Sequence, residues 1–547
     1  MTNGLCRPPR PTNEPVHSYA PGTPERASLR ARLDAMAAER LEIPCIIGGR
    51  EVRTGHMAQV VMPHDTAHVL ADVHLGGAAE VEAAVAAAAE AWHDWSRTPW
   101  EDRAAVLLRA ADLLAGPWRD TLNAATMLGQ SKTPHQAEID AACETIDFWR
   151  FNPTFLARIY AEQPDSAAGT WNRLDYRPLE GFVFAVTPFN FTAIAANLPT
   201  SPALMGNTVI WKPASTAMLV AYYLMKLLQE AGLPDGVINL VYGKGSEIGD
   251  AILQRPELAG VHFTGSTGVF QGIWRTIGAR IEQYRSYPRI VGETGGKDFV
   301  VAHASADVEA LVAATVRGAF EYQGQKCSAA SRLFVPRSLW PTVRERLVAE
   351  VESIKMGDVR DFSNFMGAVI DAASFAKQKA AIEEARTHPD TSIVVGGGVD
   401  DSRGWFVQPT VVLTGDPDFR LLREELFGPV LTTFVYDDAK WSETLALVDR
   451  QTPYGLTGAL FARDSRAIRE ASEALRFTAG NFYINDKPTG AIVGQQPFGG
   501  ARGSGTNDKA GSMWNLIRWT SPRAIKELHV PPRDYRYPFL SGDESEA

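Results

Sequence analysis

Cys327 is the residue in this chain best suited to nucleophilic chemistry. It lies in the segment 321–332, where its neighbours Lys326 and Ser328 are polar and Ala329 is small. A structural cysteine usually lies in an apolar run and packs as a small hydrophobe. Polar and small neighbours instead suit a thiol that a substrate can reach and that can ionise, because the thiolate is the nucleophile. By itself, such a setting is as typical of an inert cysteine as of a reactive one.

Glu293, 34 positions upstream of Cys327, could act as a general base. It ends an apolar stretch, and a single residue, Thr294, separates it from Gly295 and Gly296. A glutamate in a tight glycine turn can swing into a pocket and take a proton from water or a thiol. By itself the segment is more typical of a surface turn with a solvated carboxylate. The pair at this spacing resembles the aldehyde dehydrogenase superfamily, whose glutamate-glycine-glycine-lysine motif precedes a catalytic cysteine.

The composition is ordinary for a globular protein. The chain has 547 residues, of which 45% are hydrophobic and 22% charged, and its net charge is −10. That acidic balance argues against nucleic-acid binding, and no apolar run approaches the ~18 residues of a membrane span. The four cysteines, at positions 6, 45, 143 and 327, are too far apart for a metal clip or a disulfide framework. We therefore expect no metal, no membrane association and no nucleic-acid partner.

The first residues bear on the location of the protein. Residues 1–11 contain Arg7 and Arg10 but no apolar core, so they do not form a secretory signal, and they are short for a transit peptide. Together with the cysteine usage, this favours a cytoplasmic enzyme in a reducing compartment.

Short apolar strands alternate with helices from residue 181 onward, which predicts an α/β fold. The first series has expected strands at 182–186, 208–211, 237–241 and 260–263. The second has expected strands at 299–302, 333–335, 392–395, 430–435 and 456–461. This predicts two doubly wound parallel sheets covered on both faces, with ligands beyond the carboxyl ends of the strands.

The resemblance assigns roles to these parts of the chain. It implies that residues 1–164 and 181–293 form an N-terminal arm and a Rossmann-like NAD-binding domain, and that 294–514 form the catalytic domain. A small β element, with a hairpin at 165–180 and a tail at 515–547, occupies the places where relatives exchange strands between subunits. The resemblance therefore implies a homodimer or an assembly of dimers.

Two segments at expected strand ends could hold a dinucleotide. Gly265 and Ser266 lie between a strand and a helix, where backbone N–H groups attract a pyrophosphate and a hydroxyl adds a donor; a plain helix cap is the alternative. Lys212 ends another strand and could reach ribose hydroxyls, or extend to solvent. The usual Gly-x-Gly-x-x-Gly fingerprint does not follow any expected strand, so the site rests on these segments.

The resemblance implies a use for each of these residues with NAD. Lys212 would hold the adenosine ribose and Ser266 a phosphate, while Glu425 and Phe427 would hold the nicotinamide ribose and ring. Many NAD-linked relatives have a glutamate where this chain has Ser215. That difference leaves NADP open, although NAD is the expected cofactor.

Asn190 lies in the segment 187–192, which resembles the family segment whose asparagine supplies an oxyanion donor. Its amide and the backbone N–H of Cys327 would stabilise a tetrahedral alkoxide, and such donors accelerate reactions roughly 10²–10³-fold. The alternative is that Asn190 caps the helix expected to begin near residue 192.

The resemblance is closest to the subfamily that oxidises L-glutamate γ-semialdehyde, which is in equilibrium with 1-pyrroline-5-carboxylate. The matching segments, in chain order, are 12–16, 136–142, 188–194, 488–505 and 507–509. This implies NAD-dependent oxidation to L-glutamate through a cysteine thiohemiacetal and thioester, the second step of proline catabolism. It also implies a functional link to a separate proline dehydrogenase.

The same resemblance implies a set of substrate-binding residues. Ser328 and the backbone N–H groups of Gly490 and Ala491 would hold the α-carboxylate, although some relatives have serine where Ala491 stands. The remaining contacts would come from Phe191 and Phe498 on the methylenes and from Glu144 on the ammonium. From sequence alone, Glu144 could equally be a solvated helix residue, and phenylalanines in apolar surroundings are mostly core.

Two other functions stay open from the sequence. Another semialdehyde dehydrogenase, for example one acting on succinate semialdehyde, would use the same nucleophile. A catalytically silent NAD-binding protein of the same fold would have no chemical reason to retain Cys327, Glu293 and Asn190 together.

Overall fold

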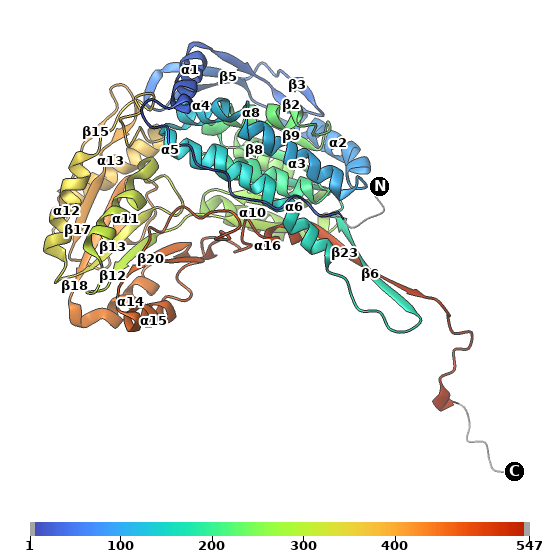
Figure 1. Ribbon diagram of the computed structural model, residues 1–547. Helices are drawn as coiled ribbons and strands as arrows, with labels where there is room; N and C mark the ends of the chain where they lie inside the picture. Colours follow the sequence, from blue (N-terminus) through green and yellow to red (C-terminus); the bar gives the residue numbers. More distant parts are fainter. Residues whose placement is uncertain (1–5, 541–547) are drawn as a thin grey trace.

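The computed structural model describes residues 6–540. Residues 1–5 and 541–547, which belong to the predicted arm and tail, lie outside the described residues. Two sheets with their covering helices lie side by side, and a two-stranded ribbon projects from the body (Figure 1).

The first sheet carries the strands expected between residues 182 and 263. Its order is β11 (Arg289–Glu293), β10 (Leu258–Thr264), β7 (Phe182–Thr187), β8 (Thr208–Pro213), β9 (Ile238–Leu240), β2 (Cys45–Ile47) and β3 (Arg50–Val52). The strands from β11 to β9 run parallel, and every residue of β8 and β10 is buried. Burial on both faces explains why these strands are continuous apolar runs. The antiparallel hairpin β2–β3 joins this sheet through β9.

Helices pack against this sheet: α2 (Ala78–Trp95) contacts β2, β7, β8 and β9, and α7 (Thr192–Leu204) contacts β7, β8 and β10. The other helices of this half are α3 (Trp100–Ala115), α4 (Arg119–Gln130), α5 (Pro134–Ala137), the π-helix η1 (Glu138–Glu144), α6 (Thr145–Ala161), α8 (Met218–Glu230), α9 (Asp250–Leu253) and α10 (Thr267–Ala279). Helix α1 (Pro24–Ala38) lies near the N-terminus and packs on α4. A further three-stranded sheet that the sequence did not predict consists of β1 (Leu41–Ile43), β4 (Met57–Met62) and β5 (Asp65–His74).

The second sheet carries the later series. Its order is β14 (Thr391–Val395), β17 (Thr410–Thr414), β18 (Val430–Tyr436), β13 (Ala330–Pro336), β12 (Asp298–Ala302), β20 (Thr457–Phe461) and β21 (Asn481–Ile484). The strand expected at 392–395 is an exception to the parallel pattern, because β14 pairs antiparallel with β17 at the edge of the sheet. Strands β17 and β21 were not predicted.

The second sheet is also packed between helices. They are α11 (Val308–Phe320), α12 (Trp340–Ser353), α13 (Ala372–Thr387), α14 (Trp441–Arg450) and α15 (Ser465–Ala474). Short pairs of strands and a last helix complete the chain: β15 (Val399–Asp400), β16 (Phe406–Val407), β19 (Tyr454–Gly455), β22 (Ala501–Arg502) and α16 (Met513–Ile517).

The projecting ribbon corrects one expectation. Residues 165–180 do not form a hairpin of their own: they supply one strand, β6 (Thr170–Pro178), whose antiparallel partner is β23 (Thr520–Leu528). The segments are distant in sequence but adjacent in space (Figure 1). In residues 6–540, no helix combines the length and apolarity needed to cross a bilayer.

Candidate active site

Cys327 lies where two cavities meet. It follows the short helix η5 (Glu321–Gly324) and precedes β13, the central strand of the second sheet. It lines a cavity of about 350 Å³ and, on its other side, a cavity of about 760 Å³. A single thiol therefore faces two separate binding spaces, as a nucleophile acting between a substrate and a cofactor requires.

The backbone before Cys327 takes a conformation that few residues adopt. Tyr322, Gln323 and Gly324 have φ angles of 52°, 55° and 65°. A Cβ on Gly324 would lie 2.5 Å from the Gly428 carbonyl oxygen, so glycine is required there. Side chains hold the turn in place: the Gln325 carboxamide oxygen accepts a hydrogen bond from Ile370 N–H at 2.9 Å. The nucleophile is thus presented by a rigid turn.

The thiol of Cys327 is neutral in its resting state. Burial raises its pKa well above the usual value, and the carboxylates of Asp298, Glu425 and Glu293 add to the effect. Formation of the reactive thiolate therefore requires a proton acceptor or a positive charge brought by a ligand.

Glu293 is a cavity residue, and the solvated-turn interpretation is wrong. It ends β11 and lines the 350 Å³ cavity together with Cys327. Its Oε2 accepts a hydrogen bond from Gly500 N–H at 2.7 Å. Burial raises the pKa of this carboxyl well above the usual value, while that hydrogen bond and Lys509 act in the opposite direction. A carboxyl with a raised pKa in a cavity is suited to proton transfer.

Asn190 does not cap a helix. The helix α7 begins at Thr192 and its N-cap residue is Phe191, while its first two N–H groups, those of Thr192 and Ala193, donate to the Asp140 carboxylate at 2.9 Å each. Instead, the buried Asn190 amide donates a hydrogen bond to the Gln325 carbonyl oxygen at 3.0 Å, two residues before Cys327. Asn190 also lines the 760 Å³ cavity, so its amide lies beside the nucleophile segment on the cofactor side.

The 760 Å³ cavity lies beyond the ends of β8 and β10 and gathers most of the predicted cofactor residues. Those that line it are Lys212, Gly265, Ser266, Glu425 and Phe427. Lys212 is buried, with its Nζ donating to the Pro213 carbonyl oxygen at 3.1 Å, so it does not extend to solvent. Ser266 occupies the N-cap position of α10 without making a side-chain cap hydrogen bond, which leaves its hydroxyl to face the cavity. Ser215 is exposed and is not among the lining residues.

Glu425 and Phe427 form the end of this cavity nearest to Cys327. Glu425 Oε1 accepts a hydrogen bond from Gly296 N–H at 2.8 Å, and a Cβ on Gly295 would lie 2.1 Å from Glu425 Oε2. The glycines after Glu293 therefore let this carboxylate approach the backbone. Phe427, at a φ of 61°, packs edge-on against Phe189 at a centroid distance of 5.7 Å. A carboxylate and an aromatic face suit a ribose and a planar ring, so these residues fit a dinucleotide.

The 350 Å³ cavity gathers all the predicted substrate residues. Those that line it, besides Cys327 and Glu293, are Glu144, Phe191, Ser328, Gly490, Ala491 and Phe498. Glu144 ends the π-helix η1 and is not a solvated helix residue. Burial raises its pKa to about 8, with Asp140 adding to the effect and Lys132 opposing it. The phenylalanines lie on the cavity wall, and Lys132 Nζ is 4.6 Å from the Phe191 ring centroid.

Sequence reasoning missed two lysines and the N-terminal arm in this cavity wall. Lys326 and Lys487 line it, and both face Glu321, at 3.0 and 4.0 Å. Burial alone would raise the pKa of Glu321, but the two lysines and Arg317 outweigh it and hold the value at about 2. Both lysines are therefore paired with this carboxylate. The one sequence signal was that Lys326 directly precedes the cysteine.

The N-terminal arm reaches the same cavity from the other end of the sequence. Asn13, Glu14 and Val16 line it, although residues 6–20 contain no helix or strand. The one sequence signal for them was the subfamily match at 12–16, which gave no role to these residues. Within residues 6–540, no three His, Cys, Asp or Glu side chains are placed to hold a metal ion.

The chain matches the profile of the Aldehyde dehydrogenase family over residues 51–525. It is 51% identical to the mitochondrial delta-1-pyrroline-5-carboxylate dehydrogenase of Dictyostelium discoideum, over 98% of this chain and 97% of that protein. A crystal structure of the Mycobacterium tuberculosis delta-pyrroline-5-carboxylate dehydrogenase bound with NAD is 54% identical, with a TM-score of 0.96 over 99% of this chain and 100% of that one. Proline utilization A from Bdellovibrio bacteriovorus is 30% identical, with a TM-score of 0.90 over 95% of this chain and 53% of that one.

Proposed function

The chain belongs to the aldehyde dehydrogenase family, and from this premise we propose that it oxidises L-glutamate γ-semialdehyde to L-glutamate with NAD⁺. The observation that carries this function is the position of Cys327 on the wall of both cavities. The relatives named for 1-pyrroline-5-carboxylate, from which the semialdehyde forms by ring opening, support this substrate. The reaction is the second step of proline catabolism.

The larger cavity is the proposed NAD⁺ site. Lys212 would hold the adenosine ribose, and the amides at Gly265 with the Ser266 hydroxyl would hold the pyrophosphate. Glu425 and Phe427 would hold the nicotinamide ribose and ring. When bound, NAD⁺ accepts the hydride that leaves the substrate carbon. Ser215 is exposed and does not line the cavity, and the NAD-bound structural neighbour supports NAD as the proposed cofactor.

The protein side chains carry the covalent steps. The Cys327 thiolate attacks the aldehyde carbon, and the Asn190 amide and the Cys327 N–H stabilise the alkoxide of the thiohemiacetal. Loss of hydride from that carbon gives a thioester. Glu293 then takes a proton from a water, the resulting hydroxide attacks the thioester carbonyl, and the carbon–sulfur bond breaks to release L-glutamate and the Cys327 thiolate. One N–H of the Asn190 amide donates to the Gln325 carbonyl oxygen in this structure, which leaves its second N–H to donate to the alkoxide.

The smaller cavity suits an amino acid better than a simple semialdehyde. Ser328 and the backbone N–H groups at Gly490 and Ala491 would bind the α-carboxylate, and Lys326 and Lys487 add positive charge at that end. Glu144 gives the ammonium an anionic partner, which succinate semialdehyde would not use. Phe191 and Phe498 would contact the methylenes between the two ends.

NADH production from a panel of aldehydes tests this function. We expect L-glutamate γ-semialdehyde, supplied as 1-pyrroline-5-carboxylate, to give much the highest kcat/KM, with succinate semialdehyde and propanal as comparisons and NADP⁺ as a second cofactor. A higher kcat/KM for succinate semialdehyde would exclude the amino-acid assignment. If no aldehyde gives NADH, the protein would be a catalytically silent NAD-binding protein.

Assembly and location form a finer part of the proposal. We propose that residues 1–164 and 181–293 bind NAD, that 294–514 carry catalysis, and that the β6–β23 ribbon joins subunits of a homodimer or an assembly of dimers. Trp171 and Leu528 on the ribbon are large apolar residues that are exposed in the single chain, which supports contact of the ribbon with a second subunit. Light scattering that gives the mass of a monomer at micromolar concentration would contradict the proposed dimer.

We also propose a functional link to a separate proline dehydrogenase, supported by the likeness to proline utilization A, and a cytoplasmic location. The latter differs from the mitochondrial location in the name of the Dictyostelium relative. Cell fractionation followed by the NADH assay would decide between the two locations.

A further inference from the structure

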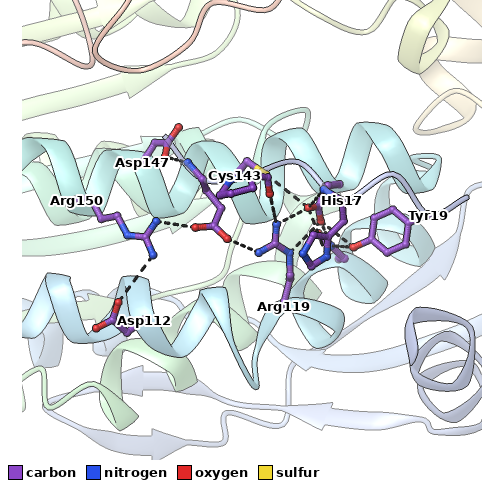
Figure 2. Close-up of polar contacts among 11 residues, drawn as sticks. His17, Tyr19, Asp112, Arg119, Cys143, Asp147 and Arg150 are labelled. Carbon is purple, nitrogen blue, oxygen red and sulfur yellow. Dashed lines mark hydrogen bonds and ion pairs between the residues drawn. The ribbon is translucent and has the colours of Figure 1, made fainter. Parts of the chain in front are cut away.

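The N-terminal arm is held against the protein by side chains rather than by secondary structure. Residues 13–19 cross α4, η1 and α6 as an irregular segment and line the smaller cavity at Asn13, Glu14 and Val16. A segment without a hydrogen-bonded ladder must find other partners for its polar groups. In this arm, those partners are buried charges on the helices beneath it (Figure 2).

Two arginines and a buried glutamate clamp the arm. Glu14 accepts from Arg119 Nη1 at 2.6 Å through Oε1 and from Arg150 Nη1 at 2.6 Å through Oε2. Arg119 also donates to the Pro15 carbonyl oxygen at 3.0 Å and pairs with Glu138 (Figure 2). Glu138 in turn accepts from the Tyr19 hydroxyl at 2.8 Å. Because these charges are paired and largely removed from solvent, loss of any one leaves another uncompensated. The arm is therefore a fixed part of the cavity wall.

Asn13 uses every polar atom of its side chain to join two parts of that wall. Its Nδ2 donates to Asp147 Oδ2 in α6 at 2.8 Å and to the Val493 carbonyl oxygen at 2.8 Å. Its Oδ1 accepts from Gln495 Nε2 at 2.9 Å. Asp147 also accepts the Glu14 N–H at 2.8 Å through Oδ1, which fixes the direction of the chain. One amide thus links a helix to the turn 492–495.

That turn directly continues the loop proposed to bind the α-carboxylate. Ala491 precedes it, and Lys487 holds the start of the loop by donating to the Thr489 carbonyl oxygen at 3.2 Å. Gly494, with a φ of 83°, packs so closely on α6 that a Cβ there would lie 2.2 Å from Phe151. Asn13 therefore holds the far end of a loop whose near end is already tied by a lysine.

We propose that Asn13 is a positioning residue for substrate binding: by tying the turn 492–495 to α6, it sets the backbone N–H groups of Gly490 and Ala491 where they receive the α-carboxylate. This inference rests on the proposed function. It assigns the N-terminal arm a part in substrate selection and not only in folding, because the loop it fixes contacts the carboxylate end and not the reacting aldehyde.

An Asn13→Ala protein tests this directly. Asn13 is only partly buried and the charge clamp at Glu14 stays intact, so the variant should fold, with a thermal midpoint lowered modestly by the loss of three hydrogen bonds. We expect KM for L-glutamate γ-semialdehyde to rise about tenfold, the change that corresponds to losing about 1.4 kcal/mol of hydrogen bonding. The kcat and the KM for NAD⁺ should stay at wild-type values. For propanal, which has no carboxylate, kcat/KM should be unchanged.

Two further variants sharpen the test. Asn13→Asp keeps the acceptor for Gln495 but removes both donors and places a second carboxylate against Asp147, so its KM for the semialdehyde should rise at least as much. Ser18→Ala, in the same arm, removes a hydroxyl that accepts from the Ala20 N–H at 3.3 Å on the exposed side, and it should behave as wild type.

The outcomes separate this inference from the proposed function. An equal fall in kcat/KM for the semialdehyde and propanal would show a general structural role and overturn the inference, as would an unchanged KM in Asn13→Ala. Both results would leave the proposed function standing if the wild-type protein still prefers the semialdehyde. Wild-type protein without that preference would overturn the proposed function, and this inference with it.

Discussion

The two cavities that meet at Cys327 are built in different ways. The larger, proposed for NAD, lies at the carboxyl ends of β8 and β10, and Lys212, Gly265 and Ser266 lie within or directly after those strand ends. The smaller, proposed for the aldehyde, is lined on one side by the ends of β10 and β11 and completed by η1, the loop 487–495 and the N-terminal arm, which are joined by side-chain hydrogen bonds and ion pairs. Both sites thus use the first sheet, but only the substrate site also depends on the N-terminal arm and its contacts with segments that are distant in the sequence.

This difference indicates where specificity can change without loss of the fold. The loops and arm around the smaller cavity contribute no strand to either large sheet, so changes there alter the substrate while the sheet keeps the cofactor in place. Substitutions at the shared wall, in contrast, should affect chemistry on both sides. Three experiments test this comparison.

The largest effect is expected at the shared wall. Cys327→Ala removes the nucleophile, and the steady-state rate should fall by roughly 10⁴-fold or more, as for other covalent nucleophiles. Because Cys327 is one of many residues lining the larger cavity, NAD⁺ binding by calorimetry should be unchanged. Turnover near the wild-type rate would exclude the covalent mechanism, and a loss of NAD⁺ binding would contradict the separation of the two cavities.

Glu293→Gln should affect only the second half of the reaction, by about 10²–10⁴-fold. The variant should release a burst of NADH and then turn over slowly, because the thioester forms but water is not activated. In the wild type, burial raises the pKa of Glu293, and the active base appears only as the proton leaves. Thioester hydrolysis should therefore accelerate with rising pH, and this acceleration should vanish in the variant. A normal steady-state rate in stopped-flow measurements would remove Glu293 from the role.

The smallest effects are expected from two variants that each change only one of the two cavities. Lys212→Ala should raise KM for NAD⁺ about tenfold and leave KM for the semialdehyde unchanged, and Glu144→Gln should do the reverse. Glu144 must be ionised to pair with an ammonium, and its pKa is about 8, so the wild-type KM for the semialdehyde should fall as pH rises through that value. Comparison with Glu144→Gln at each pH cancels the pH dependence of ring opening. Equal changes in both KM values in either variant would show that the two cavities do not bind their ligands independently.

The sequence predicted the sheets and the strand-end residues because their signals are local. Strands such as 182–186 are uninterrupted apolar runs, and Lys212 and Ser266 follow such runs directly. The catalytic and substrate residues came from the family resemblance, and the structure brings them to one cavity or the other. Strand β17 is also a local β-branched run, and it could have been predicted.

Other features could not be predicted, because their signals are not local. Asn13 bonds to a carbonyl oxygen 480 residues away, and no periodicity marks an arm without helix or strand. The pairing of β6 with β23 likewise depends on a partner far along the chain, so residues 165–180 alone resembled a hairpin. Lys487 becomes part of the site only when the fold brings it to Glu321.

The neutral thiol of Cys327 has a consequence for the lifetime of the enzyme. Peroxides and alkylating agents attack thiolates far faster than thiols. A sulfur held protonated by burial and neighbouring carboxylates is therefore shielded from oxidative damage while the enzyme stands idle, and it becomes vulnerable only in the interval when it is also productive.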